Sequence, residues 1–208
     1  MIKNIIFDWS GVIIDDLLTV YQAAMMNFEK LGEEKISLEE FKRGWEQPYM
    51  VFYSKYIPEI TKEEQDVLYK ESYKEAVLKY PFKPYPRIKD TLEKFKKAGF
   101  NMVILSSNHS EYLLSEIEEF DLDGFFSEVN GGVHDKFKAV AEMIKRNGFR
   151  EKETLFVGDT THEVEAGKSA GIKTASVTWG YHDENRLKSA SPDFIIHNLK
   201  DLENIILG

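Results

Sequence analysis

The sequence contains no cysteine among its 208 residues. It therefore has no disulfide bond, no thiolate metal site and no cysteine nucleophile. It also lacks an apolar run of the roughly 20 residues that a membrane helix needs. The first apolar stretch is interrupted by Asp8 and has no cleavage-type ending, unlike a signal peptide. We therefore expect a cytoplasmic protein with no membrane partner.

Basic residues are the scarcer charge, with 27 Lys and Arg against 36 Asp and Glu and a formal net charge of -9. Binding to a nucleic-acid backbone needs clustered Lys and Arg, so we expect no nucleic-acid partner. An anionic ligand must then be attracted by local groups or by a bound cation, because the overall field of the protein repels it.

Residues 2–7 have the apolar, β-prone composition of a buried strand, and the run stops at Asp8. From residue 82 onward, helical patterns alternate with short apolar segments. We expect strands at Asn101–Leu105, Phe125–Val129, Thr154–Val157, Lys173–Val177 and Asp193–Ile196, with helices between them. Such alternation is typical of a parallel sheet covered by helices on both faces. We therefore predict a Rossmann-like, three-layer α/β core formed by residues 1–14 and 82–208.

Residues 15–81 show helical spacing and no convincing strand. One helix is expected to end at Gly32, a second to open with a capping box at Ser37, and a third to run from Thr61 to about Tyr80. Aromatic residues gather at positions 49–56, and we expect them to form the core of a bundle. This segment is predicted to be an all-helical subdomain inserted into the core.

Three of the expected core strands end in polar residues: Asp8, Ser106 and Asp159. Singly, each could be a turn or cap residue. In a parallel sheet, however, the carboxyl ends of the strands lie along one edge, where ligands bind. We therefore expect these three side chains to meet in one site.

The residues around these strand ends resemble the motifs of the haloacid dehalogenase (HAD) superfamily of hydrolases, and of its phosphoglycolate-phosphatase-like members in particular. Asp8-Trp9-Ser10-Gly11-Val12 resembles motif I, Met102-Val-Ile-Leu-Ser106 resembles motif II, and Leu155-Phe-Val-Gly-Asp159 with Glu163 resembles motif IV. Lys136 matches the lysine of motif III, with Lys138 as a rival. The helical insertion after motif I corresponds to a type C1 cap.

The resemblance implies a hydrolase of a small phosphorylated metabolite, acting as a monomer or homodimer. Asp8 would be the nucleophile that forms an aspartyl phosphate. The phosphoryl group would be bound by Ser106, Ser107, Asn108 and Lys136. Mg²⁺ would be held by Asp8, the carbonyl of Ser10, Asp159 and Glu163, an oxygen-only set of the kind that this cation prefers.

Ser10 departs from the family pattern, in which this place carries a second Asp that acts as the general acid and base. We keep Ser10 among the catalytic positions, although a serine hydroxyl exchanges protons poorly near neutral pH. Two alternatives to an ordinary phosphatase therefore stay open. One is C–P bond cleavage like that of phosphonoacetaldehyde hydrolases, which carry Asp-Trp-Ala-Gly here. The other is a phospholigand-binding or regulatory protein with little turnover.

Overall fold

The computed structural model describes residues 1–208 and divides the chain into two compact units. One unit consists of Met1–Ile14 together with Pro84–Gly208, and the other is Asp15–Lys83. The two connecting segments run side by side, because Ile14 and Pro84 form an isolated antiparallel bridge and Asp15 N–H donates to the Lys83 carbonyl at 2.9 Å.

The first unit is built on a six-stranded parallel sheet in the order β3-β2-β1-β4-β5-β6. The strands are β1 Asn4–Phe7, β2 Asn101–Leu105, β3 Glu128–Asn130, β4 Thr154–Gly158, β5 Lys173–Val177 and β6 Phe194–Ile196. Every residue of β1 and β4 is buried, as expected of strands in the middle of a parallel sheet. The predicted α/β fold class is thus confirmed.

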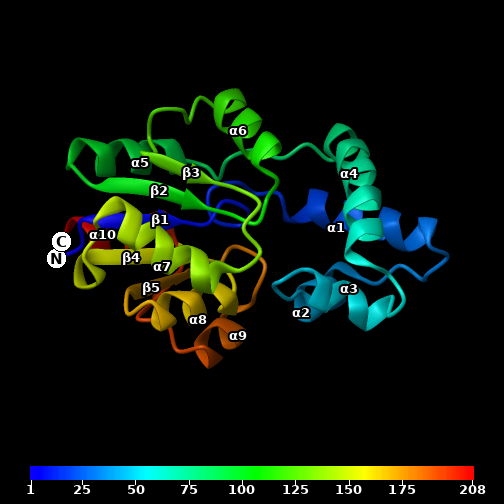
Figure 1. The fold of residues 1–208 in the computed structure, drawn as a ribbon. Coiled ribbons are helices and arrows are strands. Elements are labelled where there is room, and N and C mark those ends of the chain that lie inside the picture. The colour runs from blue at the N-terminus through cyan, green and yellow to red at the C-terminus, as the bar shows by residue number, and fades with distance from the viewer. The chain divides into compact units, whose positions relative to one another are not determined.

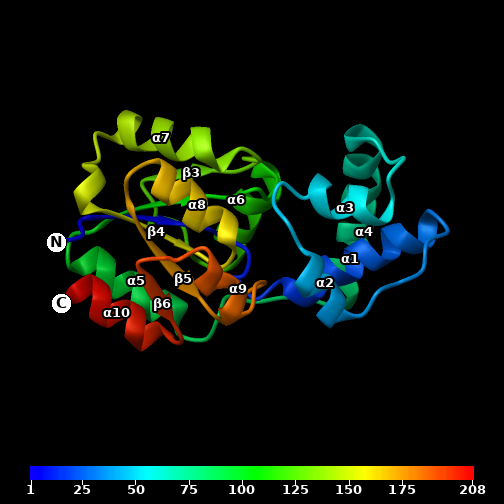
Figure 2. The same cartoon turned by 90° about the horizontal axis from the view of Figure 1, so that it is seen from below.

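Helices cover both faces of this sheet (Figures 1 and 2). They are α5 Ile88–Lys97, α6 Ser110–Glu119, α7 Lys136–Asn147, α8 Thr161–Ser169, α9 Glu184–Ser189 and α10 Leu199–Leu207, with a 3-10 turn at Glu151–Glu153. Figure 2 shows α7 and α8 on one side of the sheet and α5 and α10 on the other. The arrangement is the predicted three-layer core.

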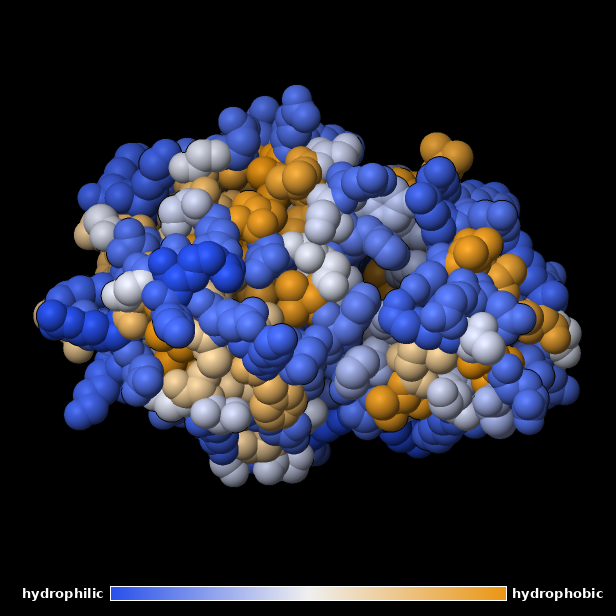
Figure 3. All heavy atoms as spheres, viewed as in Figure 1, coloured by the Kyte–Doolittle hydropathy of each residue, from blue (hydrophilic) through white to orange (hydrophobic).

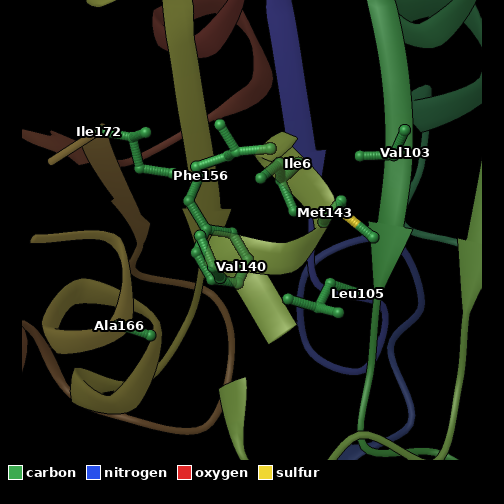
Figure 4. Close-up of a cluster of buried hydrophobic side chains, with 9 residues drawn as sticks. Ile6, Val103, Leu105, Val140, Met143, Phe156, Ala166 and Ile172 are labelled. Carbon is green, nitrogen blue, oxygen red and sulfur yellow. The ribbon is translucent and has the colours of Figure 1, made fainter. Parts of the chain in front are cut away.

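A buried apolar cluster joins the sheet to α7 and α8 (Figure 4). Ile6, Val103 and Phe156 project from the three central strands β1, β2 and β4. They meet Val140 and Met143 of α7, and all five side chains are at most 1% exposed. Because these residues fix the strands in register, the strand ends that follow them are held in fixed positions as well.

The second unit consists of four helices: α1 Leu17–Lys30, α2 Leu38–Gly44, α3 Met50–Tyr56 and α4 Lys62–Lys79. Thr61 and Glu64 form the capping box of α4, whereas at α2 the Ser37 side chain accepts from Glu40 N–H without a reciprocal bond. The aromatic segment, for which no helix was predicted, forms α3. Phe52 and Tyr53 on it are buried, which confirms that these two aromatics are core residues.

Two elements of the first unit differ from the sequence-based expectation. The strand expected at Phe125–Val129 lies at Glu128–Asn130. The aromatic residues before it are used for packing, since the Phe126 ring makes edge-on contacts with Phe7 and Trp9 at centroid distances of 6.5 and 6.4 Å. Helix α9 was not predicted, because its six residues form less than two turns.

No helix in the structure has the length and apolar composition to cross a membrane. On the face drawn in Figure 3, hydrophilic residues cover most of the surface and hydrophobic ones form separate groups. A monomer or homodimer, and a cytoplasmic location, stay predictions.

Candidate active site

The nucleophile candidate Asp8 and the acidic residue Asp159 follow directly on two neighbouring strands. Asp8 comes after Phe7, the last residue of β1, and Asp159 after Gly158, the last residue of β4. Ser106 follows β2, which pairs with β1 on its other side. The three residues are between 1% and 6% exposed. The structure therefore brings the predicted polar residues to one edge of the sheet, as their strand ends required.

Lys136 joins these residues from the first turn of α7. Its side chain is fully buried, and its ammonium group lies 2.9 Å from Asp8 Oδ2 and 2.6 Å from Glu163 Oε1. Lys138 points elsewhere, since its side chain is 75% exposed and its nearest acidic partner is Glu142 at 3.7 Å. Of the two lysines left open by the sequence, the structure brings only Lys136 to the carboxylates.

Three carboxylates, those of Asp8, Asp159 and Glu163, offer oxygen atoms that all lie within 4.8 Å of one another. Burial raises the pKa of Asp8 to about 6, against the opposing effect of Lys136. Burial, together with the charges of Glu163 and Asp8, raises the pKa of Asp159 well above its usual range. In both cases burial is the largest cause of the raised pKa, and the negative charge of Glu163 adds to it.

Glu163 differs from the other two acids because its charge is well compensated. Burial acts to raise its pKa, but the Lys136 ammonium, with hydrogen bonds from Lys136 and Thr160, lowers it to about 2. Its Oε2 accepts from Thr160 N–H at 2.9 Å and from the Thr160 hydroxyl at 2.5 Å, which completes the capping box of α8. Glu163 is thus both the helix cap and a member of the acidic cluster.

Asp159 is held by the loop after β5. Its Oδ2 accepts from Tyr181 N–H at 2.7 Å. A Cβ atom on Gly180 would lie 2.3 Å from the same oxygen, and one on Gly11 would lie 2.2 Å from it. Gly11 also has a φ of +73°, a backbone conformation that favours glycine. The two glycines therefore allow backbone to pack directly against this carboxylate.

These residues fit a divalent cation. The three buried carboxylates are accompanied by one ammonium group, so a cation would supply the missing positive charge. Carboxylate oxygens are also the ligands that Mg²⁺ takes in proteins, usually with water and a substrate phosphate.

The loop after β2 carries the predicted phosphoryl-binding residues. The Ser106 hydroxyl accepts from Asn108 N–H at 3.1 Å and retains its own hydrogen for donation. Ser106 N–H donates to the Asn130 carbonyl of β3, and Val133 N–H donates to the Ser106 carbonyl at 3.0 Å. Ser107 lies between Ser106 and Asn108 and is half-buried. The loop is thus anchored through backbone bonds at Ser106.

Ser10 lies half-buried in the turn after β1, between Trp9 and Gly11. The turn is closed by Gly11 N–H donating to the Ile14 carbonyl at 2.9 Å and by Ile13 N–H donating to the Trp9 carbonyl at 2.9 Å. The side chain here is a hydroxyl, so this position adds no carboxyl to the site. Coordination of a cation by the Ser10 carbonyl stays a prediction.

Comparison with known proteins identifies the family. The model of the haloacid dehalogenase-like hydrolase family matches residues 5–177. The chain belongs to the haloacid dehalogenase-like hydrolase family. A phosphoglycolate phosphatase of Aquifex aeolicus is 30% identical over 98% of this chain and 96% of its own length. Pyrophosphatase PpaX of Oceanobacillus iheyensis is 31% identical over 59% of each chain.

Solved structures agree on the fold. The crystal structure of a predicted phosphatase from Clostridium acetobutylicum matches with a TM-score of 0.86 and 18% identity, covering 100% of this chain and 99% of that one. At this identity the likeness supports the fold of the HAD-like chain and nothing finer.

Two residues near the site, Glu116 and His182, were missed by sequence reasoning. Glu116 of α6 accepts from the Trp9 indole N–H at 2.6 Å and from the Asn108 side-chain amide at 3.3 Å. His182 is buried and accepts at Nδ1 from Thr161 N–H at 3.2 Å. No local pattern indicates either role, because Glu116 lies 107 residues from Trp9 and His182 lies 21 residues from Thr161.

Proposed function

We propose that this HAD-like hydrolase is a Mg²⁺-dependent phosphatase of small phosphorylated metabolites, with Asp8 as its nucleophile. The observation that supports this most strongly is the contact of Asp8 Oδ2 with the buried Lys136 ammonium, inside a cluster with Asp159 and Glu163. The phosphoglycolate phosphatase relative, which covers almost the whole chain, supports the same reaction class.

In the first step, an oxygen of Asp8 attacks phosphorus in line while the bond to the leaving oxygen breaks and its electron pair departs with that group. Trp9 N–H donates to Asp8 Oδ1 at 2.8 Å and Lys136 lies against Oδ2, so both oxygens of the carboxylate are held in position. Lys136 also contributes positive charge where the phosphoryl oxygens gather.

In the second step, water attacks the phosphorus of the aspartyl phosphate, and the bond between phosphorus and the Asp8 oxygen breaks. The Asp8 carboxylate is restored, and the released phosphate carries the protons of the attacking water. Ser106 and Asn108, in the loop after β2, are the proposed donors to the phosphoryl oxygens in both steps. Bound Mg²⁺, held by Asp8, Asp159 and the Ser10 carbonyl with Glu163 beside it, would offset the repulsion between carboxylate and phosphate.

The helical unit Asp15–Lys83 is proposed to be a type C1 cap that selects the substrate, by its place directly after motif I. Because Ser10 cannot act as a general acid near neutral pH, we favour substrates whose leaving group departs without a proton. Phosphoanhydrides are of this kind, and a pyrophosphatase is among the relatives of the chain.

The test is steady-state hydrolysis of para-nitrophenyl phosphate, whose phenolate leaves without protonation. We expect activity with Mg²⁺, none with EDTA, and none in Asp8→Asn with the fold retained. The matched control is Asp15→Asn, the same change at an exposed position, which should keep full activity. Activity that survives in Asp8→Asn would contradict the covalent mechanism. An inactive wild-type protein that binds Mg²⁺ and phosphate would favour the binding-protein alternative or C–P cleavage.

A further inference from the structure

A buried carboxylate outside the acidic cluster links two sides of the site. Glu116 lies on α6, is 6% exposed, and accepts the Trp9 indole N–H at Oε2 at a distance of 2.6 Å. The Asn108 side-chain amide lies 3.3 Å from both carboxylate oxygens. Three segments of the chain therefore meet at one side chain: the turn after β1, the loop after β2, and α6.

We infer that Glu116 is a positioning residue that aligns the Asp8 nucleophile with the phosphoryl-binding loop through Trp9 and Asn108. The inference rests on the proposed phosphatase function. Glu116 is hydrogen-bonded to Trp9 and Asn108, and its effect on the reaction would be transmitted through these two neighbours.

On the nucleophile side, Trp9 is held at both ends. Its ring is fully buried and packs edge-on against Phe126, and its indole N–H is bound by Glu116. Its backbone N–H donates to Asp8 Oδ1 at 2.8 Å. Movement of the indole would therefore shift a donor that orients the nucleophile.

On the phosphoryl side, Asn108 is held by its backbone as well as by Glu116. Its N–H donates to the Ser106 hydroxyl at 3.1 Å, and its carbonyl accepts from Gly132 N–H at 2.6 Å. With the Asn108 side chain tied to Glu116, the loop that begins at Ser106 keeps one conformation. Glu116 thus sets the spacing between the nucleophile and the proposed phosphoryl donors.

The chemistry of the contacts explains why a carboxylate is needed. The Trp9 indole and the Asn108 amide are both donors, and a carboxylate accepts at both oxygens. A glutamine of the same shape would turn an NH₂ group toward one of these donors. The Trp9 contact, at 2.6 Å, is short for an N–H···O hydrogen bond.

The test compares Glu116→Gln with Glu119→Gln, the same change at an exposed position of the same helix. For Glu116→Gln we expect kcat toward para-nitrophenyl phosphate to fall about 10-fold or more, because a small misplacement of the reacting groups lowers the rate steeply. KM should change much less, and circular dichroism at the assay temperature should show a folded protein. Glu119→Gln should match the wild type.

Trp9→Phe, alone and combined with Glu116→Gln, separates positioning from a general loss of stability. Because the two residues act through one contact, the double variant should lose much less than the product of the single losses. Losses that multiply, or a kcat unchanged in Glu116→Gln, would overturn the inference while leaving the phosphatase proposal intact.

If the wild-type protein shows no turnover, the proposed function is refuted. The positioning role can then be tested separately by calorimetry of inorganic phosphate binding with Mg²⁺ present. The positioning role would then predict that Glu116→Gln binds phosphate about 10-fold more weakly than Glu119→Gln. Equal affinities of the two variants would overturn it.

Discussion

Replacement of Lys136 by methionine should destabilise the core unit strongly. The ammonium group is fully buried and lies 2.9 Å from Asp8 and 2.6 Å from Glu163. Burial acts to lower the pKa of Lys136, but the two carboxylates raise it, so the lysine is charged at neutral pH. Without it, the buried carboxylates lose the ammonium that offsets their charge. Removing one partner of a buried ion pair costs about 3–5 kcal/mol, and we expect a loss in this range.

The assay is urea unfolding at neutral pH with EDTA, in a Trp45→Phe background. Trp45 is the tryptophan of the helical unit, so the remaining fluorescence reports on the core unit through Trp9 and Trp179. The control is Lys138→Met, which removes an exposed lysine from the same helix and should change stability by at most about 0.5 kcal/mol. Equal losses in the two variants would refute the electrostatic account of the site.

Three further outcomes are expected. Ser10→Asp should raise kcat/KM on alkyl phosphates about 100-fold, since it restores a proton donor, while para-nitrophenyl phosphate gains far less; equal gains would contradict this role. Gly180→Ala should weaken Mg²⁺ binding about 10-fold or more by calorimetry, because its Cβ would lie 2.3 Å from Asp159 Oδ2; unchanged affinity would argue against Asp159 as a ligand. The pKa of Glu203 is lowered by hydrogen bonds from the Lys94 ammonium, which has the larger effect, and from the Thr91 hydroxyl. The ionised Glu203 therefore stabilises the fold above its unfolded-state pKa, and this stabilisation is lost as the pH falls through its folded-state pKa. Glu203→Gln should cost about 1 kcal/mol at neutral pH and nothing in strong acid, and a cost independent of pH would contradict the assignment.

The strand ends could be predicted from the sequence because they depend on local pattern. A buried strand followed by an acidic residue is visible in the sequence at Asp8 and at Asp159. The parallel topology then brings such ends together without further information. For the same reason, five of the six strands lie where their apolar runs indicate, whereas β3 is displaced because Phe126 packs on Phe7 and Trp9.

Contacts between distant side chains that do not follow a strand end could not be predicted. Lys136 and Lys138 are both lysines near the start of the same helix, and only the direction in which each side chain points separates them. Glu116 lies in an acidic helix with several exposed glutamates. Its hydrogen-bond partner Trp9 lies 107 residues away in the sequence. Local periodicity carries no signal for such a pairing.

The most direct test of the central claim is to identify the residue that carries the phosphoryl group during turnover. The enzyme would be mixed with para-nitrophenyl phosphate and Mg²⁺, quenched in acid and analysed by peptide mass spectrometry. The account predicts a phosphoryl group on Asp8 in the wild type, none in Asp8→Asn, and its loss when the quench is delayed until the substrate is consumed. A phosphoryl group on another residue, or turnover by Asp8→Asn, would contradict it.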